Sequence, residues 1–366
     1  MTTSALPLRL SLEAPRRLAA GTLFVRGTPR LREAVRIRLH DGQGTTGLGE
    51  ALPLPGYSRD DADTAFAVLT ELADKTLEVP REASGIAQIA ATLAPFDAAL
   101  VRAPSARFAL ECALLDLLSR RAGQSAAAWL AKGRQSRALQ PVAVSVLLPD
   151  DEAGAVATAA QAAARGHTVL KLKVARADRS AAQEMALLGA VRAAADAAAP
   201  GAVRLRLDAN GEMDPATLQQ RLAAWSTFGI ELIEEPLAGD ALLALPALPL
   251  PWAADESLAD PTRTAALLAL PRYRGPAALV LKPAMLGLLR CFGLAEAAAA
   301  RRLGVIVTHS LDGDLGFAAA CALAQALPQP PWPCGLAPHA GLRRTVAPQA
   351  WLPVPTGLGL GVPDWD

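Results

Sequence analysis

The first third of the chain alternates strand-like patterns with helical ones. The stretches PLRLSL and EAVRIRLHDGQGTTGLGEA alternate apolar with polar residues, which is typical of half-buried strands, and DGQG indicates a hairpin turn. Apolar residues at helical spacing follow over 60–74, 81–93 and 105–123. This pattern predicts an α+β unit, which we delimit at residues 1–125.

The pattern changes near residue 141. From there, short apolar strands alternate with helices of a dozen residues or more. The strands are expected at 141–148, 168–174, 203–210, 230–236, 252–257, 278–283, 304–310 and, more weakly, 332–338. Eight strand–helix units predict an α/β fold, a modified TIM-type β/α barrel over residues 126–336 capped by the α+β unit.

Two further expectations concern the topology. An open, doubly wound sheet is the alternative to the barrel, but no glycine-rich phosphate-binding motif follows any strand, which weakens it. The segment 337–366 is rich in Pro and Gly. We expect it to return from the barrel and pack on the α+β unit.

Composition removes several classes of function. The formal net charge is +1, with 36 basic and 35 acidic residues and no basic stripe, which argues against nucleic-acid binding. No apolar run approaches the roughly 20 residues of a membrane helix, and no secretory signal is visible. The four cysteines are scattered, which argues against a zinc site or a disulfide framework and fits the cytoplasm.

Ionisable residues mark the ends of five consecutive predicted strands. Lys173, Asp208, Glu234, Asp255 and Lys282 follow one another at about one strand–helix unit. In a β/α barrel the carboxyl ends of the strands form the rim that carries the active site. The spacing therefore predicts one cluster of two lysines and three acids.

Strand periodicity gives these side chains a direction. Lys171 and Lys173 share one face of their strand, and Leu170, Leu172 and Val174 share the other. The apolar face should meet the surrounding helices, so the lysines point into the barrel. A buried ammonium needs a partner of opposite charge, and the strand-end carboxylates supply it.

The cluster suits metal-assisted proton abstraction. Asp208, Glu234 and Asp255 offer hard oxygen ligands, which predicts one six-coordinate Mg²⁺, with Mn²⁺ as a possible substitute. A lysine buried beside a divalent cation can serve as a base. We therefore expect the partner to be a small-molecule carboxylate whose α-proton is removed while the metal stabilises the negative charge.

Each of these residues also has a plainer interpretation. Glu235 and Glu256 are expected to support or cap, because neighbours on a strand face opposite ways. His309 is assigned a structural or loop role, and Asp312 is expected to cap the next helix. The joint occurrence of five strand-end motifs in order favours the catalytic interpretation of the cluster.

The motifs KLK, LDANG, EEPL, ADESL and LKPAMLG, in this order, resemble the enolase superfamily in the branch of muconate-lactonizing enzymes. Within it the sequence most resembles the o-succinylbenzoate synthase family of menaquinone biosynthesis, through GEALPLPGYSRDD, SARFALECALLDLL and THSLDGDLG. It departs from that family at Asp312, where Glu is usual, and at Gly335–Pro338, where Gly-Leu-Asp-Thr is expected.

The resemblance implies a reaction and its residues. The reaction would be a Mg²⁺-dependent loss of water that yields o-succinylbenzoate. Lys173 would take the proton, Lys282 would stabilise the intermediate from the opposite face, and Lys171 would lie beside Lys173. The substrate-binding residues implied are Tyr57, Ser310, Asp312 and Asn210.

Other functions stay open at this point. An N-acyl amino acid racemase or a dipeptide epimerase of the same superfamily would use the same metal and lysines. A dipeptide epimerase needs an acidic pair near the eighth strand, which CGLAPHAG lacks. A catalytically idle metal-binding barrel is the rival from another class. The oligomeric state is left open, because no sequence feature addresses it.

Overall fold

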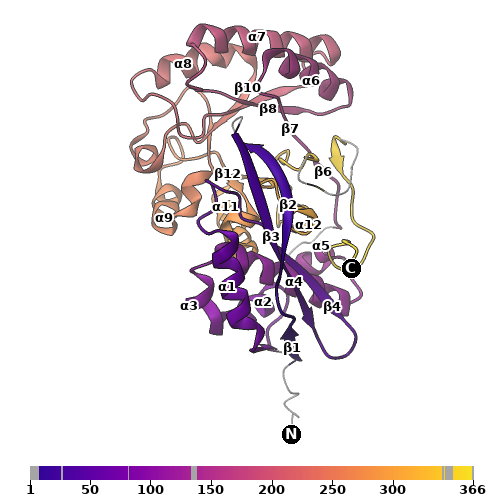
Figure 1. Ribbon diagram of the computed structural model, residues 1–366. Helices are drawn as coiled ribbons and strands as arrows, with labels where there is room; N and C mark the ends of the chain where they lie inside the picture. Colours follow the sequence, from indigo (N-terminus) through magenta and orange to yellow (C-terminus); the bar gives the residue numbers. More distant parts are fainter. Residues whose placement is uncertain are drawn as a thin grey trace.

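The computed structural model describes residues 8–25, 28–80, 82–132, 138–339, 342 and 349–364. The chain forms an N-terminal α+β unit and a β/α barrel (Figure 1). The boundaries at 125 and 336 stay predictions. Residues 1–7 and 133–137, and much of the predicted return segment, lie outside the described residues.

The N-terminal sheet is antiparallel. Its strands are β1 (Leu8–Leu12), β2 (Arg16–Val25), β3 (Thr28–His40), β4 (Thr46–Ala51) and β5 (Thr76–Val79), in the order β2-β3-β1-β5 with β4 also on β3. The DGQG turn joins β3 to β4 as predicted, and Asp41 accepts hydrogen bonds from the Gln43 and Thr45 amides. Strand β2 was not predicted, because its residues are largely exposed and Gly21 interrupts the alternation.

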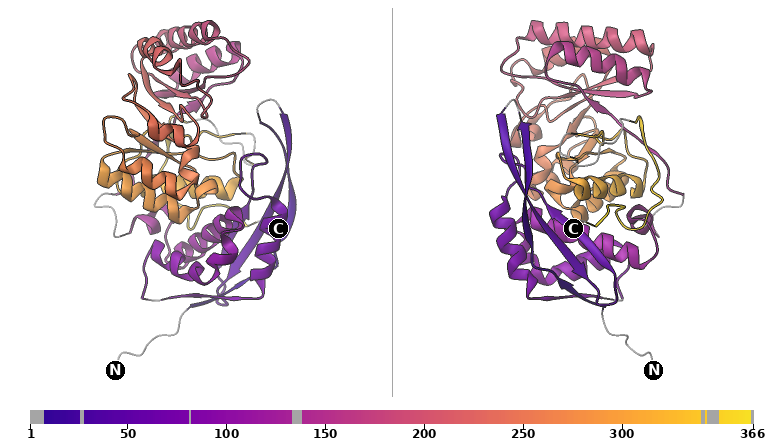
Figure 2. Two further views of the ribbon diagram at one scale, coloured as in Figure 1. Left: turned by 90° about the vertical axis from the view of Figure 1, so that its left-hand side faces the viewer. Right: turned by 45° about the vertical axis from the view of Figure 1, so that its right-hand side comes forward.

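Four helices accompany this sheet: α1 (Ala62–Ala73), α2 (Ile86–Leu93), α3 (Asp97–Leu100) and α4 (Pro104–Arg121). Helix α4 is almost entirely buried and lies directly on β4. Gly47 and Gly49 make this approach possible, because a Cβ at either position would overlap the carbonyl oxygen of Ala113 or Ala109. The β2–β3 ribbon leaves this unit and runs along the side of the barrel (Figure 2).

The barrel sheet is parallel. Its strands are β7 (Val146–Leu147), β8 (Val169–Lys173), β9 (Arg204–Asp208), β10 (Ile230–Glu234), β11 (Trp252–Ala254), β12 (Ala278–Leu281) and β13 (Gly304–Val307), adjacent in sequence order. The predicted eighth strand closes the ring, because Cys334 bridges Val144 and Gly335 bridges Thr308. The barrel is therefore confirmed and the open sheet is wrong.

The helices α6 (Glu152–Ala164), α7 (Ala181–Ala198), α8 (Leu218–Trp225), α9 (Pro261–Ala269), α11 (Leu288–Arg301) and α12 (Asp314–Ala326) follow successive strands, with short α5 (Ala126–Ala131) and α10 (Pro283–Leu286). One predicted helix is missing. Between β10 and β11 the chain makes only a 3₁₀ turn at Gly239–Ala244. The prolines at 246, 249 and 251 are incompatible with a longer helix there.

The end of the chain contacts both parts of the molecule. Strand β14 (Trp351–Leu352) pairs with β6 (Val142–Ala143) at the barrel. Further on, the Leu360 amide donates to the buried carboxylate of Asp116 on α4. All four cysteines are free thiols. Among the described residues, none of the helices has the length and apolar character needed to cross a membrane.

Candidate active site

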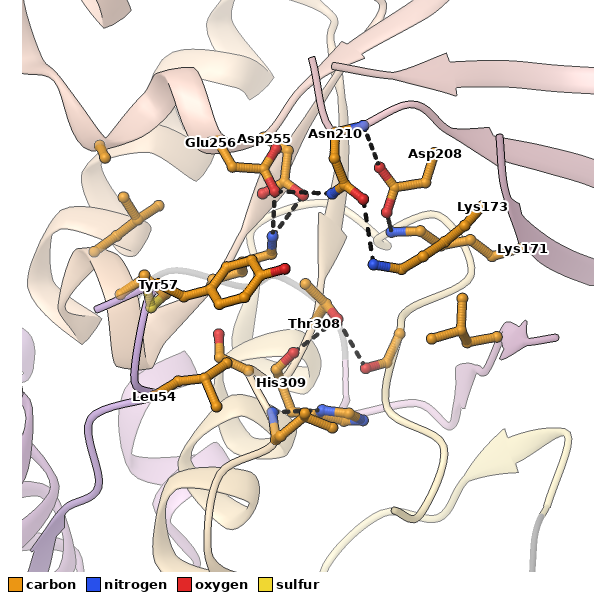
Figure 3. A pocket seen from close by; sticks show the side chains of 18 of the residues that line it. Leu54, Tyr57, Lys171, Lys173, Asp208, Asn210, Asp255, Glu256, Thr308 and His309 are labelled. Atoms are coloured by element: carbon orange, nitrogen blue, oxygen red, sulfur yellow. Dashed lines mark hydrogen bonds and ion pairs between the residues drawn. The ribbon is translucent and has the colours of Figure 1, made fainter. Parts of the chain in front are cut away.

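A cavity of about 310 Å³ opens at the carboxyl ends of the barrel strands. Its lining combines charged residues from the strand ends with apolar residues from the N-terminal loop and the barrel rim (Figure 3). Lys171, Lys173, Asp208, Asp255 and Lys282 all contribute to this lining, so the structure brings these predicted residues together. Glu234 lies directly behind them, buried against Lys171.

The first charged group joins strands β8, β9 and β10. Register pairs Lys173 with Asp208 and Asp208 with Glu234, so these side chains start at one level. The Lys171 ammonium lies 3.0 Å from Asp208 and also contacts Glu234. Burial opposes the charge of Lys171, but Asp208 and Glu234 outweigh it and raise its pKa. Burial likewise opposes the charge of Asp208, but the neighbouring ammonium groups hold its pKa below its usual range.

The second charged group lies at the ends of β11 and β12. The Lys282 ammonium donates to Asp255 over 2.6 Å and to Glu256 over 3.4 Å. Burial would lower the pKa of Lys282, but Asp255 and Glu256 outweigh burial and raise it. Strands β8 and β12 are separated by three strands in the ring, so Lys173 and Lys282 approach the cavity from opposite walls.

Lys173 has a different kind of partner. Its Nζ donates to Oδ1 of Asn210 over 3.2 Å, and among the described residues no carboxylate lies within ion-pair distance of it. Asn210 in turn donates from Nδ2 to Glu256 over 3.1 Å. Lys173 is thus the lysine of this cavity that an amide orients.

The neighbouring acids on β10 and β11 have distinct roles. Glu235 turns away from the cavity at a positive φ of 40° and accepts hydrogen bonds from the Asp255 and Ser257 amides. Burial raises its pKa to about 7. This confirms the supporting role predicted for Glu235. Glu256 instead lines the cavity and contacts Lys282 and Asn210, which strand alternation alone did not indicate.

The three acids proposed as metal ligands are each almost fully buried: Asp208, Glu234 and Asp255. Three buried carboxylates on adjacent strands are the hard donor set that Mg²⁺ prefers. These three residues therefore fit Mg²⁺ by the chemistry of their donor atoms. Within the described ranges, no three acidic, His or Cys side chains are gathered closely enough to hold an ion, and ammonium groups lie against the carboxylates instead.

Apolar side chains form a further wall of the cavity. Leu54 and Tyr57 come from the loop after β4, and Leu147, Met285, Leu286 and Leu311 come from the barrel. The loop is held by a hydrogen bond from the Leu54 amide to Ser58, whose hydroxyl contacts the Met285 sulfur. This wall suits a ring or an aliphatic chain attached to a carboxylate.

Ser310 and Asp312, two of the predicted substrate-binding residues, lie in the loop after β13 but have different surroundings. Ser310 lines the cavity, and its buried Oγ has no hydrogen-bond partner among the residues that the structure describes. Asp312 is not among the residues that line the cavity. Its carboxylate accepts a hydrogen bond from the Ser310 amide, and burial raises its pKa to about 6. The expectation that Asp312 caps the next helix is wrong, because Gly313 is the N-cap of α12.

His309 also lines the cavity, but both ring nitrogens have backbone partners. Nε2 lies 3.0 Å from the Ala337 carbonyl, and Nδ1 accepts from the Leu311 amide. Burial lowers the pKa of His309 to about 3, so the ring is neutral at physiological pH. These contacts confirm the structural role predicted for it.

Two protein-family models match the chain. "Enolase C-terminal domain-like" matches residues 154–363, and "Mandelate racemase / muconate lactonizing enzyme, N-terminal domain" matches residues 11–130. Together they include the strand-end cluster, the loop that carries Tyr57 and every residue that lines the cavity except Ser145 and Leu147.

The curated relatives include both synthases and epimerases. An o-succinylbenzoate synthase of Desulfotalea psychrophila is 36% identical over 64% of this chain and 62% of its own length. An L-Ala-D/L-Glu epimerase of Escherichia coli is 28% identical over 64% of this chain and 65% of its own length. The chain thus spans about three fifths of the length of the synthases that it matches.

Solved structures share the fold over nearly the whole chain. A mandelate racemase/muconate lactonizing protein from Herpetosiphon aurantiacus superposes with a TM-score of 0.80 at 21% identity, covering 98% of each chain. A dipeptide epimerase from Cytophaga hutchinsonii, in complex with Mg and a dipeptide, superposes with a TM-score of 0.76 at 22% identity over 98% of this chain and 95% of its own. The two family models and the capped barrel show that the chain belongs to the enolase superfamily, whose members are enzymes that use a divalent metal ion.

Proposed function

We propose that the protein is a Mg²⁺-dependent hydro-lyase that forms o-succinylbenzoate. The observation that carries the proposal is the placement of Lys173 and Lys282 on opposite walls of one cavity, across a row of buried carboxylates. The similarity to o-succinylbenzoate synthases at 36% identity supports this reaction among those of the superfamily.

The proposed reaction begins at the α-carbon of a succinyl-hydroxy-cyclohexadiene-carboxylate. Lys173 Nζ accepts the α-proton and then delivers it to the departing hydroxide, so that water leaves and the ring becomes aromatic. The Lys282 ammonium faces the opposite side of the ring, where it stabilises the negative charge. Asp208, Glu234 and Asp255 would hold Mg²⁺, which supplies electrostatic stabilisation of the substrate carboxylate when bound.

The apolar wall supports the choice of substrate. Leu54, Tyr57 and Met285 offer a surface for the ring and the succinyl chain, and closure by the N-terminal loop would exclude water. We propose Tyr57 and Ser310 as residues that contact the substrate, and Asn210 as a residue that frames its site. For Asp312 we propose an indirect part, through its hydrogen bond to the Ser310 amide.

Epimerisation is the second candidate, because an epimerase is among the relatives and lysines on both faces suit it. A dipeptide substrate brings an ammonium group that needs an anion. The predicted eighth strand, residues 332–338, contributes Gly335 and Ala337 to the cavity lining and contains no acidic residue. This composition favours the dehydration.

The test compares kcat/KM for the dehydration with kcat/KM for racemisation of N-acyl amino acids and dipeptides. We expect the dehydration to be preferred. A preference of about 100-fold for an epimerisation, roughly 2.7 kcal/mol of transition-state stabilisation, would overturn the proposal. Absence of any metal-dependent turnover would instead support an idle metal-binding barrel.

The free, scattered cysteines support a cytoplasmic location.

A further inference from the structure

Three hydrogen bonds connect Lys173 to Lys282 through two other residues that line the cavity. Lys173 donates to Oδ1 of Asn210 over 3.2 Å, and Asn210 Nδ2 donates to Glu256 Oε1 over 3.1 Å. Lys282 donates to the same oxygen of Glu256 over 3.4 Å. Figure 3 shows Asn210 between Lys173 and Glu256. Residues from four strand ends thus form one continuous link.

We propose that Asn210 and Glu256 are positioning residues that hold Lys173 against the substrate and tie its placement to Lys282. The inference deepens the proposed function, because it rests on the role of Lys173 as the base. It differs from the direct substrate contact that the family resemblance implies for Asn210.

The chemistry of Asn210 suits this role. Its amide offers an acceptor to Lys173 and a donor to Glu256 at once, which a carboxylate could not do. The position of Asn210 is itself fixed. Its backbone N–H donates to Oδ1 of Asp208 over 3.1 Å, and its backbone has a positive φ of 45°. Asn tolerates that left-handed conformation better than most residues.

The comparison with the other lysines explains why an amide is used. Lys171 and Lys282 are held by carboxylates, which stabilise their charged forms. A neutral amide oxygen can accept a hydrogen bond from Lys173 as an ammonium or as an amine. It can therefore orient the side chain both before and after proton transfer.

The experiment uses the full chain with three substitutions. Asn210→Gly removes the amide and tolerates the positive φ, Glu256→Ala removes the acceptor, and Glu256→Gln keeps an acceptor oxygen. Asp214→Ala is the control, because Asp214 is exposed in the same loop and, among the described residues, its side chain bonds only to its neighbours Ala216 and Thr217. The measurements are kcat, KM, the primary isotope effect with α-deuterated substrate, and crystal structures.

We expect Asn210→Gly and Glu256→Ala to lower kcat about 10- to 100-fold with KM changed less than about threefold, because the base is misplaced rather than the substrate released. The isotope effect should rise, and Lys173 should occupy more than one rotamer in the crystal. Glu256→Gln should keep most activity, and Asp214→Ala should match the native protein.

Two outcomes separate this inference from the proposed function. A single, unmoved Lys173 rotamer in Asn210→Gly would overturn the positioning role, whatever reaction the enzyme catalyses. A displaced Lys173 in a protein that does not perform the dehydration would overturn the proposed function and leave the link standing. A loss confined to KM would mean that Asn210 binds substrate instead, and would also overturn the inference.

Discussion

Three lysines of one cavity differ in what holds them. Lys171 and Lys282 each contact two carboxylates, whereas Lys173 contacts the amide of Asn210. Carboxylates stabilise an ammonium, and an amide only orients it. The residue scale therefore distinguishes lysines that balance charge from the one best placed to move a proton.

Removing the proposed base should abolish turnover without unfolding the protein. For Lys173→Ala we expect kcat to fall by about 10²–10⁴, the usual contribution of a general base. The midpoint of thermal unfolding should change little, because the amide of Asn210 is the one side-chain partner of Lys173 within the described part of the chain. Steady-state kinetics and a melting curve check both statements. Near-native turnover in this variant would contradict the assigned mechanism.

At the scale of elements, helix α4 connects the two parts of the molecule. The buried Glu111 carboxylate accepts hydrogen bonds from the Leu288 amide at the start of α11, a barrel helix. One turn and a half further along α4, Asp116 accepts from the Leu48 and Leu360 amides. This single helix thus contacts a sheet, a barrel helix and the C-terminal segment.

The close approach of α4 to β4 should not tolerate a side chain at Gly47 or Gly49. In Gly49→Ala the new Cβ would overlap the Ala109 carbonyl, so we expect a loss of about 1–3 kcal/mol in the free energy of unfolding. Gly189→Ala is the matched control. Its nearest neighbour would be Phe228 at 3.7 Å, and the change lies within helix α7, so stability should rise by roughly 0.5–1 kcal/mol. Urea unfolding of both variants decides.

The buried acid on α4 predicts a pH dependence of stability. Burial raises the pKa of Glu111 to about 7 from the usual value of 4.5 for a glutamate. Between these values the folded state holds a proton that the unfolded state releases, so the free energy of unfolding falls as pH rises through this window. Across this window the protonation of Glu111 should change the free energy of unfolding by about 3 kcal/mol.

Glu111→Gln should remove this part of the slope. The pKa values of Glu235 and Asp312 are also raised, to about 7 and about 6, so the slope should become shallower without vanishing. Urea unfolding at several pH values between 4.5 and 7 provides the measurement. An identical slope in the native protein and in the variant would show that Glu111 does not titrate in this range.

At the scale of the whole molecule, the proposed metal should couple to folding. Three buried carboxylates lie on adjacent strands, so an ion held by Asp208, Glu234 and Asp255 would bind the folded state alone. Mg²⁺ at 100 times its dissociation constant should then add about 2.7 kcal/mol of stability.

Thermal unfolding of chelator-treated protein with and without Mg²⁺ tests this coupling. The midpoint should rise with Mg²⁺ in the native protein and stay constant in Asp208→Asn. Asp240→Asn serves as a control, because Asp240 is an exposed acid that pairs with Arg263. A rise of equal size in Asp208→Asn would exclude Asp208 as a ligand.

Much of this protein follows from its sequence. The period-two and helical patterns predict the capped barrel, because apolar periodicity is set by which side chains each element buries. The inward direction of Lys171 and Lys173 follows from strand alternation, and the order of strand-end charges predicts which residues meet. Strand β2 escaped prediction because its residues are largely exposed and its alternation is weak.

Tertiary structure decided how the side chains pair. Glu235 has a positive φ and accepts a hydrogen bond from the Ser257 amide. The chain enters a 3₁₀ turn at Glu256–Ala259, so strand alternation no longer holds there and Glu256 lines the cavity. The partner of Lys173 is Asn210 rather than an acid, which depends on how the end of β8 meets the loop after β9. Periodicity reports which face of an element is buried. The partner that a buried charge finds is set by distances between segments far apart in the chain, which only the closed barrel determines.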